Sequence, residues 1–258
     1  MKLTRFQLRK LIKEMYSPNF EFMGIMSDIG SPMVKQLATY LMPYRGRVSF
    51  DIYDGATGVD IKMFLDDVEI GYIGADFMGD MCSNCYMVGL ASTAGGEIKK
   101  NKSLYGFRGD LIKDDLFRSG NYGPILYELC LEVVSQKGSD FYLTCDKNSL
   151  DPGAYNVWAY YLHKRPDVIT KQLDPLNVPQ EFRITPSDPT DDCESHEAEE
   201  YYQTFTSRLV HPQGPDDDPK GMYKAYTDYL IRKDPIMKGY RKESTPFLGL
   251  IESLGMII

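Results

Sequence analysis

The chain lacks the long apolar run, the basic surplus and the leader segment that would assign it to three common classes. No apolar run approaches the roughly 20 residues of a membrane-spanning helix, so we expect no membrane span. The formal net charge is −8 at pH 7, which argues against binding nucleic acid by neutralising its phosphates. The basic N-terminus has no apolar segment or cleavage site behind it, so we expect no secretory signal.

The cysteines are few and odd in number. Five cysteines among 258 residues do not suggest the even framework of a disulfide-rich domain, which predicts reduced thiols in a cytoplasm. Cys82 and Cys85 form a single Cys-x-x-Cys pair, without the second pair of a zinc knuckle or the helix of a redox motif. Cys193 and His196 have ligand spacing but stand in an acidic segment. The pattern favours ordinary thiols over zinc, and no metal site is predicted.

Hydrophobic periodicity predicts an α+β fold with a mixed, mostly antiparallel central sheet flanked by helices. Apolar stripes at helical spacing predict helices at 1–16, 30–44, 124–137, 151–163, 219–233 and 245–258. Alternating or β-branched runs predict strands at 48–53, 59–65, 68–77, 85–90, 141–145 and 168–173. Residues 92–117 have no clear period and are expected to form a long loop or hairpin.

Composition divides the chain into three parts. Residues 1–16 are a basic amphipathic helix, residues 17–175 hold the main fold, and residues 176–258 comprise an acidic arm and helices that pack back on the body. Within the arm, residues 185–218 contain ten acidic residues and one arginine. The acidic clusters at 188–192 and 216–218 lack the spacing of a calcium loop, which favours a solvated acidic surface. A polyanion mimic or a docking site for a basic substrate is the functional alternative.

The most informative segment is 118–137, a polar turn that leads into an amphipathic helix. The turn has the sequence Arg118-Ser119-Gly120-Asn121-Tyr122-Gly123. Pro124 follows it and suits the first helical position, because its missing N–H is not needed there. Backbone N–H groups at a helix N-terminus bind phosphate well. The segment therefore predicts a site for a diphosphate-bearing cofactor.

This turn and the order of elements resemble the GNAT acetyltransferase superfamily, whose signature Arg/Gln-x-x-Gly-x-Gly/Ala lies between a strand and a long helix. Arg118 and Gly123 match the signature, and Asn121 replaces its middle glycine, a change that is tolerable because Asn also adopts left-handed backbone angles. The resemblance implies that the turn binds the diphosphate of acetyl-CoA through Arg118, Ser119, Gly120, Asn121, Tyr122 and Gly123. It also implies that the preceding strand pairs with the pantetheine arm at Met87, Val88 and Gly89.

The resemblance continues on the next helix, where the family carries a tyrosine that protonates the leaving thiolate. The run at 154–158 aligns with that motif and places Trp158, which cannot act as such an acid, at the tyrosine position. The resemblance then implies Tyr161 or Tyr160 as the acid. Asp76 and Asp80 follow the third strand, near the place of a GNAT acceptor amine. They are candidate bases, with exposed loop carboxylates as the alternative.

Further segments resemble GNAT-like proteins encoded by tailed bacteriophages, namely 121–127, 146–149, 157–161, 171–174, 188–193 and the N-terminal start. The resemblance implies an acetyltransferase in the cytoplasm of an infected bacterium, or associated with the virion. Its acceptor would be an amine on a small molecule or a protein lysine. The alternative is a non-catalytic virion or assembly protein that retains the fold and docks a virion or host protein. Trp158 and the terminal extensions favour that alternative.

Overall fold

A seven-stranded sheet organises the second of the two compact units into which the chain divides, Met1–Pro43 and Tyr44–Ile258. The computed structural model describes residues 32–79, 82, 84–93, 116, 122–146, 152–176, 180, 183–193 and 235–258. In the first unit these include helix α3, Pro32–Leu41, which leads into the short 3₁₀ helix η1, Met42–Tyr44. The sequence predicted a helix here. Its buried apolar residues have helical spacing: Val34, Leu37, Ala38 and Leu41.

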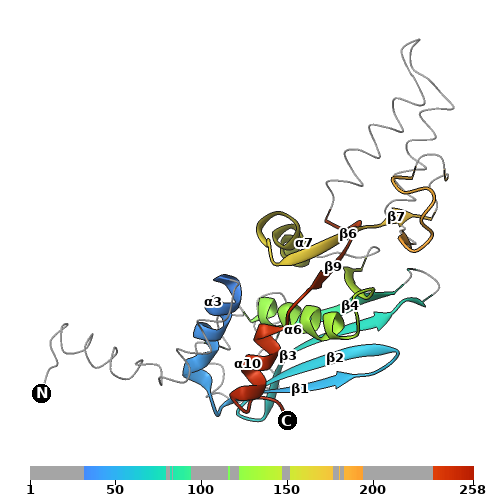
Figure 1. Cartoon of the computed structure of the whole chain (residues 1–258). Helices are drawn as coiled ribbons and strands as arrows, with labels where there is room; N and C mark the ends of the chain where they lie inside the picture. Colours follow the sequence, from blue (N-terminus) through green and yellow to red (C-terminus); the bar gives the residue numbers. More distant parts are fainter. Residues whose placement is uncertain are drawn as a thin grey trace, which may run out of the picture. The chain divides into compact units, whose positions relative to one another are not determined.

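The strand order in the sheet is β1-β2-β3-β4-β5-β9-β6. The strands are β1 Val48–Asp54, β2 Gly58–Leu65, β3 Val68–Phe77, β4 Cys85–Thr93, β5 Tyr142–Cys145, β6 Val168–Gln172 and β9 Lys238–Lys242. Strands β4 and β5 are parallel, and the other neighbours in this sheet are antiparallel. The chain therefore has an α+β fold with a mostly antiparallel, curled sheet flanked by helices, as the sequence predicted (Figure 1).

The β1–β3 meander follows from strict alternation of apolar and polar residues. In β2 the buried side chains are Val59, Ile61, Met63 and Leu65, and the residues between them point to the other face. The β2–β3 turn consists of Asp66 and Asp67, whose φ angles are 48° and 65°. Aspartate tolerates this left-handed region, and a two-residue turn of this kind matches the twist of an antiparallel pair.

Helix α6, Gly123–Gln136, lies between the parallel strands β4 and β5 in the chain and packs on one face of the sheet (Figure 1). Pro124 stands in its first turn, as predicted, and residues Ile125 to Val134 are all buried. The shorter helix α10, Pro246–Ser253, packs on α6. Helix α7, Pro152–Lys164, precedes β6. We call the sheet face that α6 covers the closed face, and the opposite face of β1–β4 the open face.

A buried cluster of charges joins α6 to the strands and to α10. Arg165 donates to Glu128 from Nη1 at 2.8 Å and from Nη2 at 2.9 Å. Lys242, the last residue of β9, donates to Glu128 at 2.7 Å and also to Glu132. Glu132 accepts the backbone N–H of Leu248 at 2.7 Å and therefore caps the first turn of α10. Each charge is paired, which is the condition under which charges are tolerated in a core.

An aromatic cluster anchors α7 to β9 and α6. The fully buried Trp158 ring lies 5.2 Å from the Tyr240 ring and 5.5 Å from the Tyr127 ring, measured between centroids. Tyr161 lies 6.0 Å from Trp158 on the same helix. Aromatic pairs at these separations add to the free energy gained by burial alone. The aromatic residues of α7 at positions 158 and 161 therefore belong to the core.

The segment after β6 carries two short parallel strands, β7 Asp174–Pro175 and β8 Asp192–Cys193. Cys193 forms a disulfide with Cys82 of the β3–β4 connection, across a sequence separation of 111. The prediction that all five thiols are reduced is therefore wrong for these two cysteines. The prediction of a solvated acidic surface is wrong for Asp191, which is buried. Burial and the neighbouring charge of Asp174 raise the pKa of Asp191 to about 6.

Strand β9 was not predicted, because its sequence, KGYRK, is too polar to suggest a strand inside a sheet. The two-residue strands β7 and β8 were not predicted either. The predicted helix at 245–258 is shorter than expected, since α10 ends at Ser253 and Ile257 instead pairs with Phe50. The predicted helices at 1–16 and 219–233, and most of the loop at 92–117, lie outside the described residues. Among the described helices, none has the length and apolarity to cross a membrane.

Candidate functional site

The parallel pairing of β4 with β5 ends at Val88, because its partner Cys145 is the last residue of β5. Its ladder runs from Cys85 opposite Tyr142 to Val88 opposite Cys145, whereas β4 continues to Thr93. At the same point the pairing of β4 with β3 shifts by one residue, since Val88 faces Ala75 and Leu90 faces Gly74. Gly89 is thus the extra residue of a β-bulge. Bulges bend a strand and locally interrupt its pairing, and they are frequent beside active sites.

The N-terminus of α6 lies at the far end of β4. A Cβ atom on Gly123 would meet Thr93 Cγ2 at 3.8 Å, and one on Gly71 would meet the Tyr122 ring at 3.2 Å. The helix therefore begins over the carboxyl end of β4, where ligands bind in parallel βαβ units. Of the predicted diphosphate residues, the structure brings Tyr122 and Gly123 to this point. Arg118, Ser119, Gly120 and Asn121 lie outside the described residues.

The three predicted pantetheine residues occupy different environments. Met87 and Val88 pair with β3 on one side and with β5 on the other. Gly89 directly follows the last β4–β5 pair. The candidate base Asp76 lies beside it, because a Cβ atom on Gly89 would stand 3.7 Å from Asp76 Oδ2. Asp76 and Gly89 are therefore neighbours, and the other candidate base, Asp80, lies outside the described residues.

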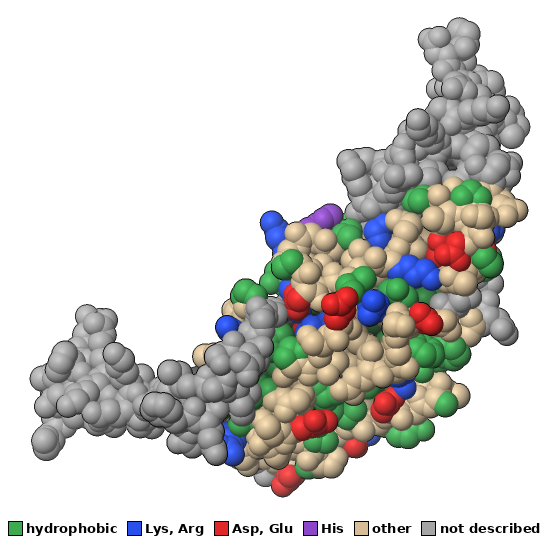
Figure 2. All heavy atoms as spheres, in the orientation of Figure 1, with side chains coloured by type: hydrophobic (Ala, Val, Ile, Leu, Met, Phe, Trp, Pro, Cys, Tyr) green, Lys and Arg blue, Asp and Glu red, His purple; other side chains and the backbone are tan. Residues whose placement is uncertain are grey.

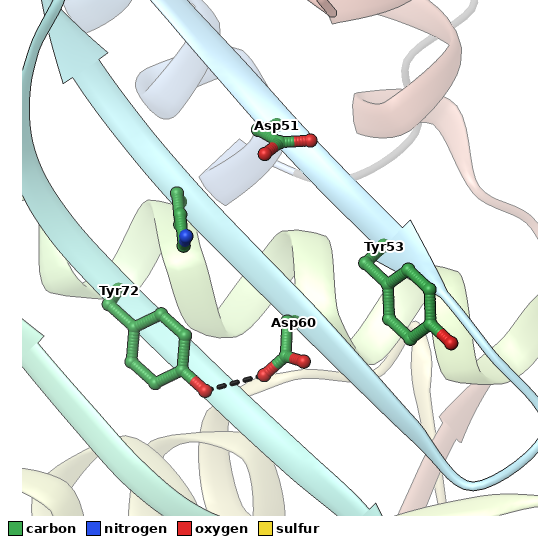
Figure 3. Close-up of a pocket in the computed structure, with 5 residues that line it drawn as sticks. Asp51, Tyr53, Asp60 and Tyr72 are labelled. Carbon is green, nitrogen blue, oxygen red and sulfur yellow. Dashed lines mark hydrogen bonds between the residues drawn. The ribbon is translucent and has the colours of Figure 1, made fainter.

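A polar hollow of about 370 Å³ lies on the open face over β1, β2 and β3 (Figure 3). It is near the lower end of the roughly 300–1,000 Å³ that ligand pockets span. Its lining residues are Asp51, Tyr53, Asp60, Lys62 and Tyr72. Figure 3 shows these side chains on one side of the strands, with α6 behind. The sequence analysis did not identify this hollow, although the alternation that marks the strands also places these residues on one face.

A hydrogen bond joins the two central residues of this hollow. The Tyr72 hydroxyl donates to Asp60 Oδ1 at 2.5 Å. This hydrogen bond, with a smaller effect of burial, raises the pKa of Tyr72 to about 12. Gly74 makes the geometry possible, because a side chain there would collide with the Tyr72 hydroxyl. The hollow thus presents a fixed carboxylate, which suits a cationic or amine-bearing ligand.

The two candidate acids on α7 have opposite exposure. Tyr161 is 0% exposed, and its hydroxyl lies 3.5 Å from Glu128 Oε2 inside the buried charge cluster. Burial and the charge of Glu128 raise the pKa of Tyr161 well above its ordinary value. Tyr160 is 41% exposed. Of the two tyrosines, Tyr160 is the one that solvent and ligands reach.

Acidic and basic side chains are interspersed over the described residues on the face seen in Figure 2. Comparisons with protein-family models, with curated proteins and with solved structures found no match to this chain.

Proposed function

We propose that this chain is a GNAT-like protein that binds acetyl-CoA and transfers the acetyl group to an amine. The observation that carries the proposal is the end of the β4–β5 pairing at Val88, with the N-terminus of α6 over the carboxyl end of the same strand, at Thr93. The edge of β4 beyond Val88, which pairs with no described strand on the β5 side, would pair with an extended chain, and the helix N-terminus would attract a diphosphate. Both features favour a ligand that is anionic at one end and extended at the other.

In this proposal the diphosphate lies at Tyr122 and Gly123, together with the rest of the signature, Arg118 to Asn121. The pantetheine arm extends along β4 from Thr93 toward Gly89. The arm would end at Met87 and Val88, because the backbone of these two residues already pairs with β3 on one side and with β5 on the other. The thioester would then lie beside Gly89 and Asp76.

The reaction would be direct attack of a neutral amine on the thioester carbonyl. Asp76, which lies beside Gly89, would take the proton that the amine loses. Backbone N–H groups near the bulge would stabilise the oxyanion. The departing thiolate takes a proton, and we assign this role to Tyr160 because Tyr161 is buried. The open-face hollow around Asp60 is the proposed binding site for the amine substrate.

Calorimetry with acetyl-CoA tests the cofactor site, and Gly123→Ala is the sharpest variant. The protein itself tolerates a methyl group there, since the nearest atom is 3.8 Å away. A methyl group between the backbone and a diphosphate should weaken binding by tenfold or more, which corresponds to about 1.4 kcal/mol. Gly249→Ala on α10 is the matched control, with nothing within 4 Å, and should leave binding unchanged. Absence of acetyl-CoA binding by the unmodified chain would refute the cofactor site.

A second candidate function is a non-catalytic virion or assembly protein that retains this fold. The observation that favours it is the packing of Trp158 and Tyr161 into the core, which removes two aromatic residues of α7 from any groove. Thiol release from acetyl-CoA over a panel of amines separates the two functions. Turnover that Tyr160→Phe abolishes supports the enzyme, with the cytoplasm of an infected bacterium as its proposed location. Acetyl-CoA binding without turnover, together with recovery of the chain in virions, supports the scaffold.

A further inference from the structure

Three cysteines that are separated in the sequence converge at one point of the fold. Cys82 lies in the β3–β4 connection, Cys85 is the first residue of β4, and Cys193 ends β8. Their three Sγ atoms all lie within 4.8 Å of one another. Cys82 and Cys193 also face each other in an antiparallel bridge. The Cys82–Cys85 pair therefore has a third cysteine, Cys193, beside it, which the sequence alone did not reveal.

The local backbone turns Cys82 and Cys85 toward the same point. The N–H of Cys85 donates to the carbonyl oxygen of Cys82 at 3.1 Å, which closes a tight turn. Asn84 within this turn has a φ angle of 57°, a left-handed conformation that asparagine tolerates. Two cysteines with two residues between them, held by a turn, have the ligand spacing of structural zinc sites.

The three cysteines are buried among apolar side chains. Cys82, Cys85 and Cys193 are 3%, 1% and 0% exposed, and they pack with Leu173, Met237, Met78 and Ile184. Thiolates in such an apolar shell are unfavourable unless a cation neutralises them. Zinc–sulfur bonds of about 2.3 Å place neighbouring sulfurs roughly 3.8 Å apart in a tetrahedral site, which is compatible with this cluster.

We propose that Cys82, Cys85 and Cys193 of the reduced chain bind one Zn²⁺, with a water molecule as the fourth ligand of the tetrahedron. The metal ties the β3–β4 connection to the β7–β8 segment, and so links two parts of the chain that are 111 residues apart. It engages all three sulfurs, whereas the disulfide engages two of them. The sequence also carries His196 three residues after Cys193, outside the described residues, and the proposal does not depend on it. The zinc site does not involve acetyl-CoA, so its test is independent of the proposed acetyltransferase function.

The disulfide and the zinc site are alternative states of the same sulfurs. A phosphine reductant and one water convert the Cys82–Cys193 disulfide into two thiols, and the phosphine becomes its oxide. Binding then exchanges the three thiol protons for one Zn²⁺, so zinc uptake should release protons and weaken as the pH falls.

Cobalt titration of the full chain tests the proposal without any mutation. Under a phosphine reductant, Co²⁺ should bind at one per chain and show sulfur-to-metal charge-transfer absorption with strong tetrahedral d–d bands, and Zn²⁺ should displace it. The same chain oxidised to the disulfide should lack these bands. A reduced chain without charge-transfer absorption, or an oxidised chain that binds equally well, overturns the proposal.

Cys85→Ala supplies the second test, because it removes the third sulfur and leaves both disulfide partners in place. Zinc affinity should fall by more than the roughly 100-fold that changes outside the ligand set can cause. Cys130→Ala, at a buried cysteine of α6, is the matched control and should keep full affinity. Far-ultraviolet circular dichroism confirms that both variants fold. Equal zinc affinity in Cys85→Ala and the unmodified chain would refute the site.

Discussion

The two faces of the sheet use similar polar residue types for different purposes. On the closed face, Glu128, Glu132 and Lys242 are buried and joined by hydrogen bonds to one another, to Arg165 and to the start of α10. On the open face, acidic residues, a lysine and tyrosines surround a hollow that solvent reaches. Charges on the closed face are part of the core, so their loss should lower the stability of the fold. Charges on the open face are available to a ligand, so their loss should change binding.

The largest effect should come from removing the cation on the closed face. Lys242→Met leaves Glu128 and Glu132 without their shared partner and should lower the free energy of unfolding by about 3–5 kcal/mol. Lys62→Met, in the open-face hollow, is the matched variant and should cost less than about 1 kcal/mol. Urea unfolding of both variants measures the difference. Equal losses would mean that the two faces do not differ as we infer.

The pH dependence of stability near neutral pH should come largely from Glu132, since the raised pKa of Asp191, about 6, is lower. Three carboxylates and two cations form the closed-face cluster, so one carboxylate favours a proton, and burial raises the pKa of Glu132 to about 7. The folded state then binds this proton more tightly than the unfolded state. The stabilisation that comes from protonated Glu132 is fully present below pH 4.5 and is lost as the pH rises through about 7.

The magnitude of this loss is on the order of 3 kcal/mol. Denaturant unfolding at intervals from pH 5 to pH 8 measures it. Glu132→Gln should flatten the dependence in that window. A variant with the same pH slope as the unmodified chain would assign the proton to another group. Glu128, whose pKa is lowered by Arg165 and Lys242 against the effect of burial, acts in the opposite direction and only at acidic pH.

Glycines on the two faces should also differ. A Cβ atom on Gly71 would stand 3.0 Å from Leu126 Cδ1 and 3.2 Å from the Tyr122 ring, so Gly71→Ala should cost about 1–3 kcal/mol. Gly89→Ala meets Asp76 at an ordinary 3.7 Å and should change stability by less than about 0.5 kcal/mol. Thermal unfolding compares the two. A large loss of stability in Gly89→Ala would show that the backbone of the bulge, and not side-chain crowding, sets the cost of a methyl group at Gly89.

A small stability effect is expected for Tyr72→Phe, which removes one hydrogen bond at a solvent-accessible site. We expect a loss of about 1 kcal/mol or less. Ultraviolet titration should show the disappearance of a phenol that ionises near pH 12. Retention of that step would place the raised pKa on another tyrosine. Asp60→Asn should lower the pKa of Tyr72 toward its ordinary value.

The sequence predicted the elements whose residues follow one clear period. The meander, α6 and α7 could be identified because their apolar residues alternate or recur at helical spacing, and most of their bounds agree within two residues. Strand β9 could not, because Lys238 and Lys242 become buried only through partners that lie far away in the sequence. The same reason hid the three-cysteine cluster, which is assembled by pairing between distant parts of the chain that no local pattern contains.

The position of β9 between β5 and β6 has a consequence for biosynthesis. Strands β5 and β6 emerge from the ribosome long before residues 238–242, the strand that joins them. Until then both have an exposed edge, and Glu128 and Glu132 lack the lysine that neutralises them. The sheet of the nascent chain therefore cannot close before residues 238–242 have been made, and the chain is most exposed to aggregation and chaperone binding during that interval.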